Sequence, residues 1–141
     1  MVVMTPSKEF IRIYQKSEVI FEENAIGDEM YVVCSGKVRL STTAPGREVV
    51  LGTLGPGELF GEMALVDSNP RSATAIAVED NTRLAALNQQ RFLYLVGQQP
   101  AFALTIMHAL CLRIRERWEL FSELLKKSDE GAESLDQLRF N

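Results

Sequence analysis

The sequence predicts a mainly β fold: a jelly-roll β-roll (double-stranded β-helix), followed by a short helix and a long C-terminal helix. Short runs of β-prone residues recur at intervals of roughly 10 to 12 residues as far as Leu87, with turn residues between them. Beyond Leu87 the apolar residues take up the spacing of helices. Many short strands at regular spacing are typical of a sandwich or jelly-roll barrel, and the helices are expected to follow it.

The expected strands are segments rich in β-branched and aromatic residues or in alternating apolar residues. They are Glu9–Gln15, Glu18–Glu23, Met30–Gly36, Lys37–Thr43, Arg47–Leu54, Ser72–Val78 and Thr82–Leu87. Residues that favour turns separate these segments. The turn residues are Gly27 and Asp28, Ser35 and Gly36, Pro45 and Gly46, Gly55 to Gly57, and Glu79 to Asn81.

Two helices are expected after the strands. Residues 88–99 have aromatic and aliphatic side chains at helical spacing, and Pro100 then begins a long helix over residues 101–127 without internal Pro or Gly. Apolar residues recur along this helix in steps of four and three, as in a heptad repeat. They are Met107, Cys111, Ile114, Trp118, Phe121 and Leu125. This stripe either packs the helix on the barrel or joins two copies of the chain in a homodimer.

The length of 141 residues suits one domain. We expect the domain to span residues 1–127 and a polar tail to span residues 128–141. No apolar run approaches the roughly 18 residues of a membrane span, and the N-terminus has no secretion signal. The two cysteines, Cys34 and Cys111, lack metal-like spacing, which favours reduced structural thiols. We therefore expect a cytoplasmic protein without membrane contact.

The composition argues against several classes of function. The single histidine, His108, lies in an amphipathic helical run, whereas metal enzymes and Ser-His or Cys-His hydrolases need histidine in a cluster or a dyad. A net charge of −4 also disfavours nucleic acid as a partner, because phosphate backbones select positive surfaces. We therefore expect no metal, no cofactor, no catalysis and no direct contact of this chain with nucleic acid.

The stretch FGEMALVDSNPRSAT, Phe60–Thr74, combines residues that suit a small sugar phosphate. Gly61 lets the backbone approach a ligand, and the good helix formers after it predict a short helical turn whose first N–H groups are free to bind an anion. Arg71 can hold an anion with its planar fork, and Ser72 adds a hydroxyl donor. Glu62 accepts hydrogen bonds only, which suits a sugar hydroxyl. Each signal is weak alone, and their combination at this spacing is specific.

Here the chain resembles a known family. FGEMAL followed by PRSATAIA is similar to the phosphate-binding cassette of cyclic-nucleotide-binding domains, found in catabolite-activator-type regulators, kinase regulatory subunits and gated channels. Upstream, GDEMYVVCSGKVRL and LGPGELFGE also match, and the resemblance spans residues 18–125. Asn24 stands where the family often has glycine, and asparagine tolerates a positive φ. The resemblance implies a β-roll flanked by helices.

The resemblance also implies a ligand and the residues that hold it. Glu62 would bind the ribose 2′-hydroxyl and Arg71 the cyclic phosphate. In the family the last helix moves over the base, and at this helix we expect Arg117 and Trp118 to make the contact. The complete expected site is Phe60, Gly61, Glu62, Met63, Ala64, Arg71, Ser72, Ala73, Arg117 and Trp118. Cyclic AMP is expected over cyclic GMP, because members that favour cyclic GMP commonly carry threonine where Ser72 stands.

Two other interpretations stay open. One is a cupin-like metalloenzyme on a similar barrel, which would need two or three barrel histidines. The other is a degenerate domain used for protein contact, which need not keep both Glu62 and Arg71. Regulators of the resembled type continue into a helix-turn-helix domain, for which the polar tail leaves no room. We therefore expect either a free-standing sensor or the sensor part of a larger protein.

Overall fold

The computed structural model describes residues 10–128. The chain divides into two compact units, one ending at Ala103 and the other beginning at Leu104, and each unit is described by itself. The strands are β1 (Ile11–Tyr14), β2 (Val19–Phe21), β3 (Glu29–Ser35), β4 (Val38–Ala44), β5 (Arg47–Leu54), β6 (Leu59–Phe60), β7 (Thr74–Ala77) and β8 (Thr82–Asn88). The helices are α1 (Met63–Val66), α2 (Gln89–Gln98) and α3 (Ala101–Ser128).

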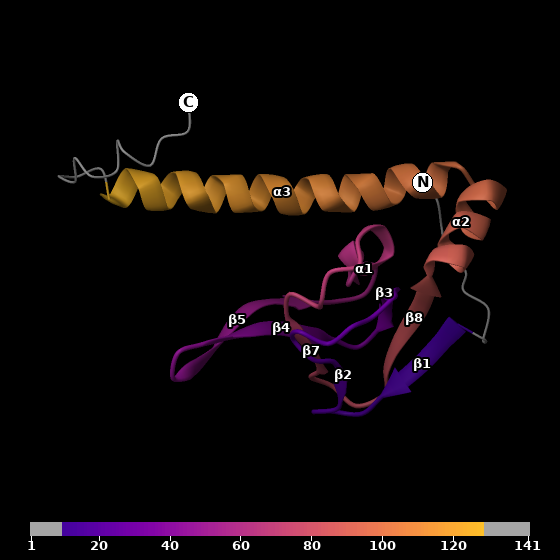
Figure 1. Ribbon diagram of the computed structural model, residues 1–141, viewed down its shortest axis with the longest axis horizontal. Helices are drawn as coiled ribbons and strands as arrows, with labels where there is room; N and C mark the ends of the chain where they lie inside the picture. The colour runs from indigo at the N-terminus through magenta and orange to yellow at the C-terminus, as the bar shows by residue number, and fades with distance from the viewer. Residues whose placement is uncertain (1–9, 129–141) are drawn as a thin grey trace. The chain divides into compact units, whose positions relative to one another are not determined.

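The first unit is built from two four-stranded antiparallel sheets (Figure 1). Their strand orders are β1-β8-β3-β6 and β2-β7-β4-β5. In the first sheet β8 lies between β1 and β3, so that Leu84 is opposite both Arg12 and Val33. Each sheet thus joins strands from the beginning and the end of the β region. This topology confirms the predicted mainly β fold with C-terminal helices.

The core of the first unit is apolar and dense. Its largest fully buried side chains include Phe60, Met30, Leu84 and Leu87. The rings of Tyr31 and Phe60 stack with centroids 5.2 Å apart, and the ring of Phe21 lies 5.9 Å from each of them. Aromatic contacts of this kind stabilise a core beyond the burial of their area. Two of these rings, those of Phe21 and Tyr31, also face the guanidinium of Arg71.

The structure contains a strand in every segment where one was expected, with ends that shift by one or two residues. Glu9, the first residue of the first segment, lies outside the described residues. The segment Ser72–Val78 becomes strand only at Thr74, because the loop before it is held by hydrogen bonds of its own. The short strand β6, Leu59–Phe60, was not expected. Two residues are too short to show a period of alternation.

The predicted helices are also present. The side chain of Asn88 caps α2 by accepting a hydrogen bond from the Arg91 N–H at 2.9 Å. The rings of Phe92 and Phe102 meet 5.7 Å apart where α2 passes into α3 within the first unit. Helix α3 ends at Ser128, one residue into the expected tail, and residues 129–141 lie outside the described part of the chain.

In the second unit, α3 carries the predicted apolar stripe on its surface. The side chains of Met107, Ile114, Trp118 and Phe121 are all exposed, between 43% and 64%. The rings of Trp118 and Phe121 make an edge-to-face contact with centroids 6.2 Å apart. His108 is exposed, as expected. Within residues 10–128, no single helix is long and apolar enough to cross a membrane, although the bent pair of α2 and α3 meets that length and composition together.

Candidate anion-binding site

Arg71 is a buried cation at the centre of the predicted cassette. Its residue is 7% exposed, and it lies in the loop between α1 and β7. The Nη2 group donates to the Glu29 carbonyl at 2.8 Å and the Nη1 group to the Gly61 carbonyl at 3.1 Å. The guanidinium carbon lies 4.1 Å from the centroid of the Phe21 ring. These contacts are a cation–π contact and two hydrogen bonds to neutral carbonyls.

No carboxylate pairs with Arg71 among the described residues, and its buried Nε group has no hydrogen-bond partner there. A buried charge without a counter-charge is costly, by several kcal/mol in real proteins after relaxation. A bound anion would supply the counter-charge and could accept the remaining N–H. Among residues 10–128, Arg71 therefore has the surroundings expected of a group that binds an anion.

Two glycines leave the space that the guanidinium occupies. A Cβ added at Gly27 would lie 2.5 Å from Nη2 of Arg71, and one added at Gly61 would lie 2.8 Å from Nη1. Gly61 also has a φ of 75°, which side chains rarely adopt. Sequence reasoning assigned Gly61 to the site but treated Gly27 only as a turn residue. A glycine before the buried β3 strand, far from Arg71 in sequence, gives no local sign of this contact.

The backbone of the Arg71 loop is fixed to the turn between β2 and β3. The Arg71 N–H donates to the Ala25 carbonyl at 2.8 Å, and the Asn24 N–H donates to the Arg71 carbonyl at 2.8 Å. Asn24 has a φ of 71°, the conformation expected at this position. A reciprocal pair of backbone hydrogen bonds therefore clamps the Arg71 loop to the turn between β2 and β3. This clamp holds the Cα of Arg71 in place independently of the ligand.

The short helix α1 follows Gly61, with Glu62 at its N-cap position. The first backbone N–H groups of this helix were expected to lack hydrogen-bond partners within the chain. This expectation is wrong for two of them. The Ala64 N–H donates to the Gly61 carbonyl at 3.2 Å and the Leu65 N–H to the Glu62 carbonyl at 3.1 Å, because the turn is tight enough to close on itself. Both bonds are at the long end of the usual N–H···O range, so an anion can compete for these donors.

The remaining predicted residues differ in accessibility. Phe60 is fully buried in the aromatic core, so its side chain cannot contact a ligand and only its backbone is available. Met63 and Ser72 are exposed, and Ala73 is buried. Arg117 and Trp118 belong to α3 in the second unit, and their part in the site stays a prediction.

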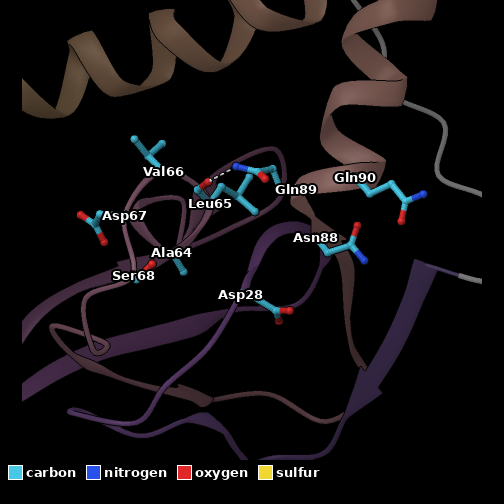
Figure 2. Close-up of a pocket in the computed structure, with 9 residues that line it drawn as sticks. All are labelled: Asp28, Ala64, Leu65, Val66, Asp67, Ser68, Asn88, Gln89 and Gln90. Carbon is cyan, nitrogen blue, oxygen red and sulfur yellow. Dashed lines mark hydrogen bonds between the residues drawn. The ribbon is translucent and has the colours of Figure 1, made fainter.

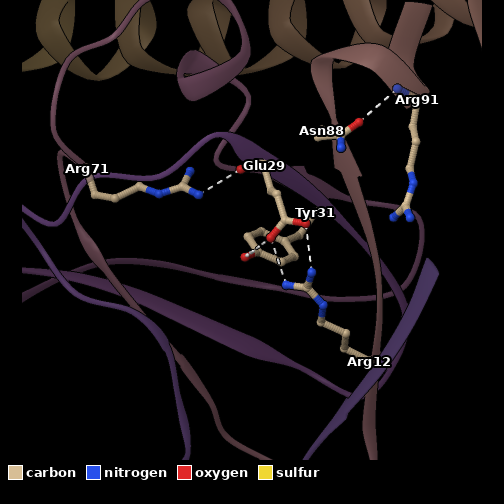
Figure 3. Close-up of polar contacts among 6 residues, drawn as sticks. All are labelled: Arg12, Glu29, Tyr31, Arg71, Asn88 and Arg91. Carbon is tan, nitrogen blue, oxygen red and sulfur yellow. Dashed lines mark hydrogen bonds and ion pairs between the residues drawn. The ribbon is translucent and has the colours of Figure 1, made fainter. Parts of the chain in front are cut away.

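Glu29 links Arg71 to a second arginine that sequence reasoning missed (Figure 3). The carboxylate of Glu29 accepts two hydrogen bonds from Arg12, each 2.7 Å long, in a bidentate ion pair. The Tyr31 hydroxyl lies 3.4 Å from the same carboxylate. Burial, and after it the negative charge of Glu29, raise the pKa of Tyr31 to about 12. Arg12 and Glu29 are separated by β8, so only the sheet order brings them together.

A separate cavity of about 370 Å³ lies beside α1 (Figure 2). Its lining is mostly polar, and neither Glu62 nor Arg71 belongs to it. The lining residues are Asp28, Ala64, Leu65, Val66, Asp67, Ser68, Asn88, Gln89 and Gln90. Across it the Gln89 side chain donates to the Leu65 carbonyl at 2.8 Å, which ties the end of α1 to the start of α2. Within residues 10–128, no group of three His, Cys, Asp or Glu side chains is placed to hold a metal ion.

Comparisons with known proteins place the residues around this site in a known family. The profile of the family described as "Cyclic nucleotide-binding domain" matches residues 11–99. The chain is 46% identical over 106 residues to the Cyclic AMP receptor protein of Thermus thermophilus, and this alignment covers 74% of the chain and 49% of that protein. The chain therefore spans about half the length of this relative.

Solved structures agree with the sequence comparisons. The crystal structure of the Thermus thermophilus catabolite activator protein matches with a TM-score of 0.72 and 44% identity, covering 82% of this chain and 54% of that one. The EAL enzyme Bd1971 in its cGMP-bound form matches with a TM-score of 0.56 and 37% identity, covering 74% of this chain and 28% of that one. The similar proteins thus include one named as a cyclic AMP receptor and one solved with cGMP bound.

Proposed function

The chain belongs to the cyclic nucleotide-binding domain family, and on that premise we propose that it is a cyclic AMP sensor module without catalytic activity. The observation that carries the proposal is the burial of Arg71 without a carboxylate partner among the described residues. A cyclic phosphate is a single negative charge with acceptor oxygens, which matches the charge and the open Nε donor of Arg71.

The rest of the cassette would hold the sugar and the other phosphate oxygens. In this proposal Glu62 accepts a hydrogen bond from the ribose 2′-hydroxyl, and Ser72 donates its hydroxyl to the phosphate. The other contacts come from the backbone of Phe60, Gly61, Met63, Ala64 and Ala73. Gly61 suits this role because its positive φ and missing side chain leave the backbone accessible. Ala64 would exchange its long hydrogen bond to Gly61 for one to the ligand.

The preference for cyclic AMP is supported by two observations. The bacterial relative described above is named as a cyclic AMP receptor and is 46% identical to this chain. Ser72 is shorter than the threonine that the resemblance associates with guanine recognition. A cGMP-bound structural neighbour makes cyclic GMP the competing ligand. A competition titration in which cyclic GMP displaces cyclic AMP at lower concentration would reverse the preference.

The experiment that tests the proposal is isothermal titration of the purified chain with cyclic AMP, cyclic GMP and linear 5′-AMP, together with metal analysis. We expect one site per chain that discriminates against 5′-AMP, whose phosphate carries an extra charge and a different geometry. Binding of no cyclic nucleotide would leave the domain as a protein-contact module. Stoichiometric metal would point to the cupin-like enzyme.

We further propose that ligand binding is read out by α3, with Arg117 and Trp118 near the base. An aromatic ring or a guanidinium can stack on a purine. Trp118 is the only tryptophan of the chain and is 64% exposed, so its fluorescence reports directly on this part of α3. Saturating cyclic AMP is expected to change its emission. An unchanged spectrum in a protein that binds the ligand would mean that this part of α3 does not respond to the ligand.

The proposal also includes a homodimer formed through the apolar stripe of α3, and a location in the cytoplasm. The output of the sensor is proposed to be regulatory, as the names of its relatives indicate. Direct contact with nucleic acid is not assigned to this chain, because its net charge is −4.

A further inference from the structure

Glu29 holds two arginines by different atoms, and this arrangement has a functional consequence (Figure 3). Its backbone carbonyl accepts a hydrogen bond from Arg71 at 2.8 Å, while its carboxylate is paired with Arg12 at 2.7 Å. The guanidinium of Arg71 is therefore bound to the backbone of the same residue whose carboxylate is paired with Arg12. The Glu29 side chain nevertheless points toward Arg12 and Tyr31, and away from Arg71.

Without Arg12, we would expect the carboxylate of Glu29 to form an ion pair with Arg71. The Glu29 side chain is only 19% exposed, so its charge is poorly hydrated and needs a partner. Arg71 has no carboxylate partner among residues 10–128 and keeps an unused Nε donor. An Arg71–Glu29 ion pair would satisfy both groups. It would also place a negative charge beside the position of the phosphate.

Arg12 prevents this by geometry as well as by charge. Its planar fork takes up both carboxylate oxygens in a bidentate pair, which fixes the direction of the Glu29 side chain. The hydroxyl of Tyr31 meets one of the same oxygens from the core side. Burial is the main cause of the raised pKa of Tyr31; the charge of Glu29 also raises this pKa, and the charges of Arg12 and Arg71 lower it. The charges of Arg12, Glu29 and Arg71 therefore all act on the same buried ring.

We propose that Arg12 is a positioning residue that reserves Arg71 for the anion of the ligand, by holding the Glu29 carboxylate away from it. This inference rests on the proposed function, because it assigns Arg71 to a bound phosphate. Arg12 lies on β1 and belongs to neither the cassette nor the expected site. Its effect would be to keep the unliganded site open to anions rather than closed by an internal ion pair.

The test is a double-mutant comparison of Arg12→Gln, Glu29→Gln and the two together, with cyclic AMP affinity measured by calorimetry. Arg12→Gln is expected to lower the affinity about tenfold, the scale of a close charge interaction in a partly buried site. Glu29→Gln and the double variant are expected to bind like the wild type, since the Glu29 carboxylate can then no longer compete for Arg71. Arg39→Gln is the matched control, because it removes an arginine paired with Glu48 in the other sheet and should leave the affinity unchanged.

A merely structural role for the pair predicts a different pattern. The double variant would then bind as weakly as Arg12→Gln or more weakly, and this result would overturn the proposal. Unchanged affinity in Arg12→Gln would also overturn it. Should Arg12→Gln fail to fold, Arg12→Lys is the second variant, because it keeps the charge but loses the bidentate fork. Its affinity for cyclic AMP is expected to lie between that of the wild type and the tenfold lower affinity expected for a protein whose Glu29 is no longer held. Affinity equal to the wild type in Arg12→Lys would count against the proposal.

A second measurement needs no ligand and separates this inference from the proposed function. The side-chain Nε–H resonance of Arg71 can be assigned in a ¹⁵N spectrum by its loss in Arg71→Lys. We expect it to shift in Arg12→Gln and to return in the double variant. Should the wild type bind no cyclic nucleotide, the proposed function fails, and the Arg71 resonance alone then decides whether Arg12 controls the internal pair. A resonance that stays in place in Arg12→Gln refutes that control.

Discussion

In the proposed site, Arg71 is a buried side chain that lacks a carboxylate partner and keeps one unbound N–H among residues 10–128. Two carbonyl oxygens and the face of Phe21 hold its guanidinium in a fixed orientation. None of these partners carries a full negative charge, so the field of the cation stays available in a buried environment. An orientation fixed before binding lowers the entropic cost of ligand capture. The same features make the site sensitive to single changes around Arg71.

Replacing Arg71 by alanine is expected to weaken cyclic AMP binding more than any other single change in the cassette. The variant would leave a buried phosphate without its counter-charge, at a cost of roughly 2–5 kcal/mol by analogy with buried interfacial charge pairs. Glu62→Ala removes a hydroxyl acceptor and is expected to cost less, roughly 1–3 kcal/mol. Calorimetry on both variants checks the order. Equal and negligible losses would mean that the ligand binds elsewhere.

Replacing Gly27 by alanine tests the role of the space around Arg71 without removing the arginine. The new Cβ would lie 2.5 to 2.8 Å from three atoms of the guanidinium side chain, so Arg71 must move. We expect weaker cyclic AMP binding with little change in thermal stability, since the displaced group is the end of a flexible side chain. Gly55→Ala is the matched control, because nothing lies within 4 Å of a Cβ at that position. Equal affinities of the two variants would contradict this account of Gly27.

At the scale of elements, the β2–β3 turn joins the cassette loop to the second sheet. The carboxylate of Glu23 accepts hydrogen bonds from the Thr42 hydroxyl and from the Thr43 N–H on β4. The Glu23 N–H in turn donates to the Thr74 hydroxyl at 2.9 Å. This residue therefore connects β2, β4 and β7 just beyond the Asn24–Arg71 clamp. Its side chain is bound in the ionised form, which makes the connection dependent on pH.

The hydrogen bond from Thr42, and after it the one from the Thr43 backbone, lower the pKa of Glu23 below its ordinary value of 4.5. A carboxyl group with a lower pKa in the folded state stabilises the fold above its unfolded pKa, and this contribution is lost as the pH falls through the folded value. The difference in melting temperature between wild type and Glu23→Gln is therefore expected to be largest near neutral pH and to shrink below about pH 4.5. Glu22→Gln serves as the control for removing one exposed charge. A difference that does not change with pH would disprove the link to Glu23 ionisation.

At the scale of the whole molecule, the surface of α3 suggests how the chain assembles. The apolar stripe from Met107 to Leu125 recurs in heptad-like steps, and charged residues flank it as they do at the edges of coiled coils. Four of its large side chains are exposed by 43% or more. Such a surface on a helix is typical of a protein–protein contact. In the proposed homodimer a second copy of the same chain would cover it, because a two-fold interface uses one patch twice.

Light scattering is expected to give the mass of a dimer at micromolar concentration. Phe121→Asp should shift the protein toward the monomer, because it places a charge in the middle of the apolar stripe. Ser122→Asp is the matched control, since it adds the same charge at the neighbouring exposed residue. A monomeric wild type would refute the dimer, and a dimeric Phe121→Asp would place the interface on another surface.

Features that depend on neighbours along the chain could be predicted from the residues alone. Alternating apolar residues predicted the strands, and Pro100 with the heptad-like steps predicted α3, because side-chain periodicity is a local property of each element. The spacing of Gly61, Glu62 and Arg71 predicted an anion site through a family motif. The single missed strand, β6, has only two residues and therefore no period to detect.

The surroundings of Arg71, in contrast, became visible only in the folded chain. The space left by Gly27, the carbonyl of Glu29 and the pairing of Glu29 with Arg12 all involve residues far apart in sequence. The order β1-β8-β3 places Arg12 and Glu29 on strands that flank a common neighbour. Strand order is set by how the whole core packs, and no local pattern of residues encodes it. The charge balance around a buried arginine therefore becomes visible only when the sheets are assembled.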